Sequence, residues 1–200
     1  IEGNSLTEEQ VNLHLEGKLQ VPSSVEYQVQ EIDNLVAAFN RITKSIAERG
    51  PSTALQVDQV LSFNQLILRG LPLEEGVVPG TLRQHEVTVG RYRGAPAEDL
   101  HFLLGRLCEW LNEEDFDVGG ALGLGSVIIK AILAHLYLAW IHPFGDGNGR
   151  TARLVEFYLL VNAGVPDACA HLLSNHYNRT RPKYYQELQY ASESHGDVVR

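Results

Sequence analysis

A chain of 200 residues, of which 44% are hydrophobic, can bury a sizeable core and suits one domain, or one domain with a small addition. The formal net charge of −9 and the lack of any basic run argue against a nucleic-acid surface. No secretory signal opens the sequence, and its longest apolar run, 127–141, is too short to cross a bilayer of about 30 Å. We therefore expect neither nucleic acid nor a membrane as a partner.

The first seventy residues predict three helices. Thr7 begins a capping box of the form S/T-x-x-E/Q, and a short helix should follow it. Ser24 is expected to cap a long helix, whose apolar residues keep a period of 3.6 as far as Gly50. A third helix is expected over 58–69. The apolar stripe of the long helix indicates a core-facing side.

Residues 71–96 differ in character, because prolines and glycines interrupt any helix while 85–89 alternate as an extended segment does. This pattern favours a short hairpin, although a plain connector would look similar. Pro96, followed by two acids, opens another helix. The glycine-rich stretch 119–125 lacks the pattern GxxxxGK[ST], so we expect an interhelical loop and not a phosphate site.

The two cysteines, Cys108 and Cys169, form no CxxC pair and lie among apolar residues. Buried free thiols in a reducing compartment are the simplest interpretation, which predicts a cytoplasmic protein. The sequence contains no methionine, which indicates a segment of a longer protein.

The segment 142–153 is the richest in chemistry. It lies between apolar residues at helical spacing over 127–141 and again after 154, and Pro143 should end the first helix. Three glycines and two arginines at the start of a helix can bind phosphate, because that helix end presents unpaired N–H groups. Asp146 would repel phosphate unless a cation such as Mg²⁺ bridged them. His142 could accept a proton from a hydroxyl near neutral pH.

This segment resembles the signature of the Fic family, HxFx[D/E]GN[G/K]RxxR, and matches it at every specified position from His142 to Arg153. The resemblance implies that His142 is the general base for a target hydroxyl and that Asp146 holds Mg²⁺. It also implies a set of residues that bind the phosphates of ATP: Gly147, Asn148, Gly149, Arg150 and Arg153.

Three further segments gain a meaning from the resemblance. The chain begins Ile-Glu-Gly-Asn, like the end of the family's inhibitory helix, so Glu2 would pair with Arg153 and block the γ-phosphate. Residues 79–90 resemble the family's flap, which pairs with a target strand. Its candidate target-binding residues are Val87, Thr88 and Val89. Aromatic residues of the terminal helix approach the adenine in the family, but Tyr184 and Tyr185 are equally well explained as core aromatics.

His135 lies seven residues before His142 and so on nearly the same helix face. A metal site formed with Asp146 is one interpretation of this spacing. A hydrogen-bonded core histidine is the better one. Beyond Gly164, a polar stretch over 175–181 precedes the terminal helix.

The sequence therefore predicts a mainly α fold, a Fic-type helical bundle with a short β-hairpin flap. Residues 1–70 would form N-terminal helices with the remnant of an inhibitory helix, and 71–200 the Fic core. The resemblance implies a protein adenylyltransferase that moves AMP from Mg-ATP to a Ser, Thr or Tyr hydroxyl of a target protein, inhibited through Glu2. A deAMPylase using the same site and a non-catalytic nucleotide-binding module are the alternatives. The oligomeric state stays open, a homodimer included.

Overall fold

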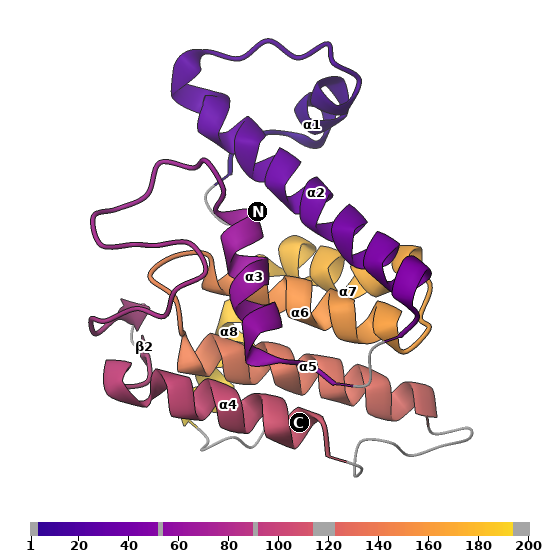
Figure 1. The fold of residues 1–200 in the computed structure, drawn as a ribbon. Coiled ribbons are helices and arrows are strands. Elements are labelled where there is room, and N and C mark those ends of the chain that lie inside the picture. Colours follow the sequence, from indigo (N-terminus) through magenta and orange to yellow (C-terminus); the bar gives the residue numbers. More distant parts are fainter. Residues whose placement is uncertain (1–3, 52–53, 90–91, 114–122, 194–200) are drawn as a thin grey trace.

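The structure, a computed structural model, describes residues 4–51, 54–89, 92–113 and 123–193 (Figure 1). Helices make up most of it, and the two strands form a hairpin, which confirms the predicted fold class. The helices are α1 (Glu8–Leu15), α2 (Glu26–Arg49), α3 (Val57–Ile67), α4 (Leu100–Leu111), α5 (Gly123–Ile141), α6 (Asn148–Asn162), α7 (Asp167–Arg179) and α8 (Arg181–Glu193). The strands are β1 (Thr88–Val89) and β2 (Tyr92–Arg93), and η1 (Ser23–Val25) and η2 (Ala97–Asp99) are single 3₁₀ turns.

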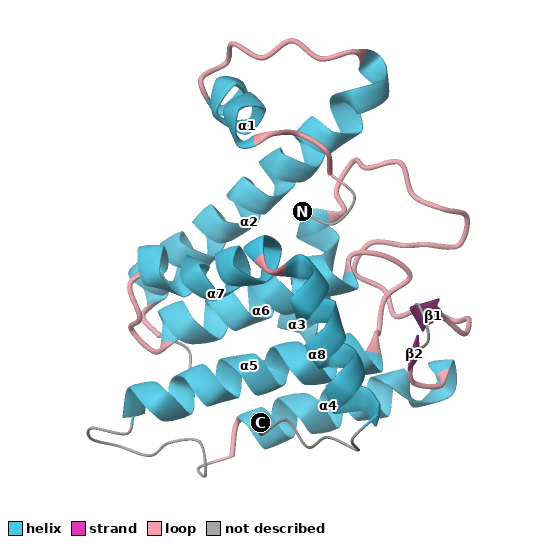
Figure 2. Ribbon diagram, turned by 180° about the vertical axis from the view of Figure 1, so that it is seen from behind, coloured by secondary structure: helices cyan, strands magenta, loops and turns pink. Residues whose placement is uncertain are grey.

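Helix α6 is the centre of the bundle. It packs against α2, α3, α5 and α7, and the two opposite views show it between them (Figures 1 and 2). Residues on all sides of α6 are buried, among them the charged Arg150 and Glu156. A helix buried all round needs partners for every polar side chain it carries. The first residues of α6 are also the predicted phosphate-binding segment, so this segment is anchored in the core.

One hydrophobic core joins the two segments that the sequence separates at residue 70. It contains Ile42 of α2 and Phe63 of α3 together with Leu104 of α4 and Phe157 of α6. The N-terminal helices are thus part of the packing that supports the predicted Fic core. Helix α1 has no buried residue and lies beside the first turns of α2 (Figure 1).

Several helix ends have the chemistry that the sequence predicts. Thr7 accepts a hydrogen bond from the amide of Gln10, and the Gln10 side chain accepts one from the amide of Thr7, which is a complete capping box. At the end of α6, Gly164 has a φ of 87°. The amide of Val165 donates to the carbonyl of Leu160 at 3.0 Å, so the last carbonyls of α6 are satisfied.

Two predictions about helix starts are wrong. Ser24 does not cap the long helix, because the amide of Val25 donates to the carbonyl of Pro22 and closes a 3₁₀ turn before α2 begins. Residues 123–125, expected in a loop, form the first turn of α5, while 119–122 lie outside the described residues. The apolar residues that follow make packing of α5 favourable enough to outweigh about 1 kcal/mol per glycine.

The predictions for the segment after Gly164 were also incomplete. Helix α7 was not predicted, because Ala170 is its one buried residue among those described and its apolar stripe is therefore narrow. Cys169 lies on α7 and is exposed, contrary to the prediction, whereas Cys108 is buried. Both are free thiols, and burial raises the pKa of Cys108 to about 11.

Helix α5 is long and apolar enough to suit a membrane span by length and composition. It starts before the apolar run that the sequence shows, which is why it reaches 19 residues. In the fold α5 packs against α4 and α6 and buries Ala131, Ala134 and Leu138 in the core. One face of α5 therefore lies in the core, whereas Leu124, Ile129 and Ile132 are exposed.

Asn34 connects α2 to the end of α3. Its side chain is buried, and Nδ2 donates to the carbonyls of Ile67 at 3.1 Å and Arg69 at 2.7 Å. The last carbonyls of a helix accept no hydrogen bond within the helix, so a buried one needs a donor from elsewhere in the chain.

We expect Asn34→Ala to lower the free energy of unfolding by about 1–3 kcal/mol, because it removes the donor of the buried Ile67 carbonyl. Urea denaturation followed by circular dichroism measures this change. Asn40→Ala, at an exposed position of the same helix, is the matched control. Equal midpoints for the two variants would show that the Asn34 contacts do not stabilise the fold.

Candidate active site

His142 is the first residue of the turn between α5 and α6. Its backbone is left-handed, with a φ of 49°, and its amide still donates to the carbonyl of Leu138 at 3.0 Å. Because Pro143 follows, α5 ends here, as the sequence predicts. The backbone of the turn therefore sets the position of the imidazole.

The half-buried imidazole of His142 has its Nδ1 atom 3.3 Å from the carbonyl oxygen of Ala139. A carbonyl oxygen only accepts, so Nδ1 donates in this contact. In a neutral imidazole the other nitrogen, Nε2, then carries the lone pair. Nε2 is thus the atom that can take a proton from a hydroxyl.

Arg83 binds the carbonyl group next to this base. The arginine is only 4% exposed, and its Nε donates to the carbonyl of His142 at 2.8 Å. Its Nη1 and Nη2 donate to the carbonyls of His85 and Ala95 on either side of the hairpin. The amide of Arg83 also donates to the carbonyl of Pro143 at 3.0 Å. One side chain therefore joins the hairpin to the turn.

Sequence analysis missed Arg83. A single arginine in a turn-rich segment is usually exposed, and its burial depends on carbonyl groups far away in the chain. Burial lowers the pKa of its guanidinium, although the ordinary value is so high that the group keeps its charge. The one local signal was its place between Gly80 and the extended segment 85–89.

The hairpin carries the predicted target-binding residues. Strand β1 pairs antiparallel with β2, with Thr88 opposite Arg93 and Val89 opposite Tyr92. The hydroxyl of Tyr92 donates to the carbonyl of Trp140 at 2.6 Å, which attaches the hairpin to the end of α5. Thr88 is exposed. The structure thus places the flap against the turn that contains His142.

The glycine-containing turn before α6 is stabilised by hydrogen bonds within the turn itself. The side chain of Asn148 bonds to the backbone of Phe144: Oδ1 accepts from the amide of Phe144 at 2.9 Å, and Nδ2 donates to its carbonyl at 2.7 Å. Gly147 has a φ of 75°, and a Cβ atom added to it would lie 3.1 Å from Cδ1 of Ile67. Both the conformation and the space require glycine at this position.

Asn64 is a second residue that sequence analysis did not assign to the site. It is fully buried on α3, and its Nδ2 donates to the carbonyl of Asp146 at 3.0 Å and to Oγ1 of Thr151 at 3.2 Å. Its Oδ1 accepts from the amide of Gly80 at 2.9 Å. Asn64 therefore connects α3, the flap and the start of α6.

The first turn of α6 can bind an anion. The amides of Asn148, Gly149 and Arg150 have no acceptor within the helix, because they belong to its first turn. The partial positive charge of the helix end lies on the same amides. The Asn148 side chain is used within the turn, so it is the backbone of this residue that can face a phosphate.

Arg150 is buried between two carboxylates. Its Nη1 donates to Oε1 of Glu31 at 2.5 Å, and its Nη2 donates to both oxygens of Asp146, at 3.0 and 3.1 Å. Arg150 is 8% exposed, whereas the side chain of Asp146 is 47% exposed. Sequence analysis did not identify Glu31, which comes from α2. Part of the hydrogen-bonding capacity of Arg150 is therefore already used by these carboxylates.

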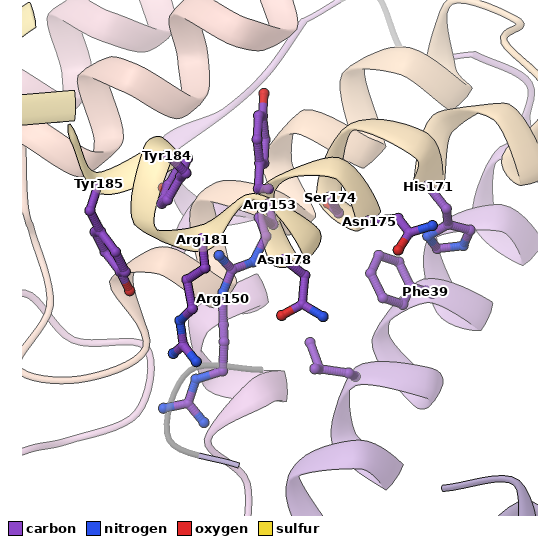
Figure 3. A pocket seen from close by; sticks show the side chains of 12 residues that line it. Phe39, Arg150, Arg153, His171, Ser174, Asn175, Asn178, Arg181, Tyr184 and Tyr185 are labelled. Carbon is purple, nitrogen blue, oxygen red and sulfur yellow. The ribbon is translucent and has the colours of Figure 1, made fainter. Parts of the chain in front are cut away.

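A pocket of about 270 Å³ opens beside this ion pair (Figure 3). It brings together four of the predicted nucleotide-binding residues, and α2, α7 and α8 supply the others that line it. The lining residues are Leu35, Phe39, Arg150, Arg153, His171, Ser174, Asn175, Tyr177, Asn178, Arg181, Tyr184 and Tyr185. Burial lowers the pKa of His171, which favours its neutral form.

His135 is a hydrogen-bonded core histidine, as predicted. Its Nδ1 lies 2.9 Å from Oε2 of Glu156, and its Nε2 lies 2.7 Å from the hydroxyl of Tyr184. Oε1 of Glu156 accepts from the hydroxyl of Tyr177 at 3.0 Å. Burial, followed by the charge of Glu156, raises the pKa of Tyr177 well above its ordinary value. Tyr177 and Tyr184, two of the three tyrosines that line the pocket, are thus bonded to buried side chains.

In the part of the chain that the structure describes, no group of three His, Cys, Asp or Glu side chains could hold a metal ion by itself. Asp146 alone offers a half-exposed carboxylate at the phosphate-binding turn. The predicted inhibitory residue, Glu2, lies outside the described residues. Asn4 marks where that segment joins the fold, since its Nδ2 donates to Oε2 of Glu31 at 3.0 Å.

Comparison with known proteins gives a consistent result. The family model described as the Fic/DOC family matches residues 54–160. The chain is 33% identical over 199 residues to a protein named protein adenylyltransferase Fic from Culex quinquefasciatus, and 29% identical to one of the same name from Nematostella vectensis. These alignments cover 99% of this chain but only 36% and 42% of those proteins.

Solved structures also resemble this fold. Fic-1 from C. elegans aligns with a TM-score of 0.74 at 26% identity, covering 98% of this chain and 53% of that one. A Fic family protein from Desulfovibrio desulfuricans G20 aligns with a TM-score of 0.73 at 25% identity, covering 99% of this chain and 55% of the other. The chain thus spans about half the length of these structures and less of the curated relatives.

We expect Arg83→Lys to lower the free energy of unfolding by about 1.5–3 kcal/mol, because an ammonium group cannot replace the planar fork that reaches several carbonyls at once. Amide hydrogen exchange should become faster in the hairpin. Arg93→Lys, on the exposed face of the same hairpin, is the control and should leave the thermal midpoint nearly unchanged. Similar exchange rates in both variants would argue against this role of Arg83.

Proposed function

Since the chain belongs to the Fic/DOC family, we propose that it is a protein adenylyltransferase, which moves AMP from ATP to a hydroxyl side chain of a target protein. The observation that carries this proposal is the position of His142. Its Nε2 can accept a proton beside a helix end that can bind phosphate, and a hairpin lies next to both. The names of the relatives from Culex and Nematostella support the same activity.

The proposed reaction starts with the hydroxyl of the target side chain. Nε2 of His142 takes its proton, and the hydroxyl oxygen forms a bond to the α-phosphorus of ATP. The bond from this phosphorus to the bridging oxygen breaks, and pyrophosphate leaves with its electron pair. The amides of Asn148, Gly149 and Arg150 face the charge that develops on the phosphates, so they stabilise the transition state more than the ground state.

Mg²⁺ fits this site through Asp146. Magnesium in nucleotide sites is usually held by one or two carboxylates, substrate phosphates and water. The side chain of Asp146 is 47% exposed and precedes the phosphate-binding amides, although it also accepts from Arg150. When bound there, Mg²⁺ neutralises phosphate charge. Asp146 would hold it, and Asn64 fixes the backbone of Asp146 through the carbonyl group.

The hairpin supplies a site for the target. Strand β1 pairs with β2 along one edge, so a target strand would add along the other edge, at Val87, Thr88 and Val89. Backbone pairing is tolerant of sequence, and it would set the register of the target hydroxyl relative to His142. Arg83 and Tyr92 support this role, because they attach the hairpin to the turn that carries the base.

We expect His142→Asn to reduce AMP transfer by about 10²- to 10⁴-fold, which is the contribution typical of a general base, while ATP affinity changes little. Asparagine tolerates the left-handed backbone of this residue better than alanine does. Incorporation of labelled AMP into protein measures transfer, and calorimetry measures ATP affinity. His101→Asn, on α4, is the control. Transfer at the wild-type rate by the His142 variant would refute the assignment.

Inhibition through Glu2 is part of the proposal. The resemblance pairs Glu2 with Arg153, and Arg153 lies in the pocket. Two residues after Glu2, Asn4 is bonded to Glu31, which in turn accepts from Arg150. This chain of contacts supports a position of the N-terminal segment near the phosphate-binding residues. A carboxylate on Arg153 would compete with the γ-phosphate for one guanidinium.

We expect Glu2→Gly to raise AMP transfer by about tenfold to a hundredfold, since a charge-assisted hydrogen bond contributes about 1.5–3 kcal/mol. Asn4→Ala should act in the same direction, because it detaches the segment from Glu31. Glu9→Gly, an exposed acid of α1, is the control for the loss of charge. The assay is the incorporation of labelled AMP. Equal rates in all three variants and the wild type would exclude inhibition through this segment.

A further inference from the structure

A third arginine, Arg181, lies in the pocket and is not part of the Fic signature. It is the first residue of α8, and its guanidinium points in the same direction as that of Arg150 (Figure 3). Arg181, Tyr184 and Tyr185 are spaced three and four residues apart, so they share one face of α8. All three line the pocket.

The core holds α8 in this position. The hydroxyl of Tyr184 is 2.7 Å from Nε2 of His135, which is itself bonded to the buried Glu156. Tyr184 lies one helical turn after Arg181. The start of α8 is therefore fixed by buried polar contacts, and the half-buried Arg181 is held at the pocket rather than extended into solvent.

The charges around the pocket favour a further basic side chain beside the phosphates of a nucleotide. Arg150 is balanced by Glu31 and Asp146, so these three side chains together carry one negative charge. ATP brings several negative charges to the same place. Among the described residues that line the pocket none is acidic, whereas Arg150, Arg153 and Arg181 are basic. Arg181 thus adds positive charge that no carboxylate of the lining offsets.

We propose that Arg181 binds the outer phosphates of the nucleotide together with Arg153. This role rests on the proposed function, and it adds a residue from outside the signature to the nucleotide site. Arginine suits it because a guanidinium is a planar fork that matches two phosphate oxygens at once. Arg150 then acts mainly as the link between Asp146 and Glu31, while Arg181 and Arg153 supply the hydrogen bonds to phosphate.

The test compares Arg181→Gln with Arg179→Gln. Both variants remove one positive charge, but Arg179 is the exposed last residue of α7 and is outside the pocket lining. Calorimetry at one fixed Mg²⁺ concentration gives the Kd for ATP and for AMP. We expect Arg181→Gln to weaken ATP binding about tenfold to a hundredfold and to leave AMP binding nearly unchanged, because AMP lacks the outer phosphates. Arg179→Gln should change neither.

Arg181→Lys provides a second measurement, since it keeps the charge and loses the fork. Its ATP affinity should lie between those of the wild type and Arg181→Gln. Equal ATP affinity in Arg181→Gln and Arg179→Gln would overturn the inference, and so would equal losses for ATP and AMP, which would indicate a contact with the base or ribose. If the wild-type chain bound no ATP, the proposed function would fail as well; normal wild-type binding separates the two failures.

Discussion

The site depends on one constraint: backbone polar groups at the turn between α5 and α6 are buried and need hydrogen-bond partners. The chain leaves α5 at His142 with a left-handed backbone, and the carbonyl of His142 accepts a hydrogen bond from Nε of Arg83. Asn64 and Asn148 supply further donors, to the carbonyls of Asp146 and Phe144. These side chains come from the flap, α3 and α6. The turn is thus held in place by side chains from three separate parts of the chain.

The same principle explains the charged groups in the centre of the bundle. Helix α6 carries Arg150 and Glu156 into the core, and each has buried partners, Glu31 for the first and His135 with Tyr177 for the second. Such pairs add little net stability, because removal of charges from water offsets much of their attraction. Here these pairs fix the positions of helices and side chains relative to one another. One pair fixes the start of α6 against α2, and the other fixes the tyrosines of α7 and α8 at the pocket.

The arrangement also separates the tasks within the site. The turn with His142 faces the hairpin, which is attached to it by Arg83 and Tyr92. The pocket lies on the side of Arg153, between α2, α7 and α8. The first turn of α6 connects the two, so a nucleotide in the pocket and a hydroxyl at the hairpin would meet at its amides.

The sequence alone determined the mainly α fold, most helix ends and the residues of the signature. Their signals are local: a proline after His142, a glycine at position 164, a capping box at Thr7 and a motif that is contiguous in the chain. It also suggested that His135 is a core residue. Only the tertiary structure placed Arg83, Asn64, Glu31 and Arg181 at the site, because the groups around each of them are distant in the chain. The predictions for α7 and Cys169 failed for a related reason. A helix with a single buried residue has little periodic signal in its sequence, and the exposure of Cys169 depends on which neighbours cover it in the fold.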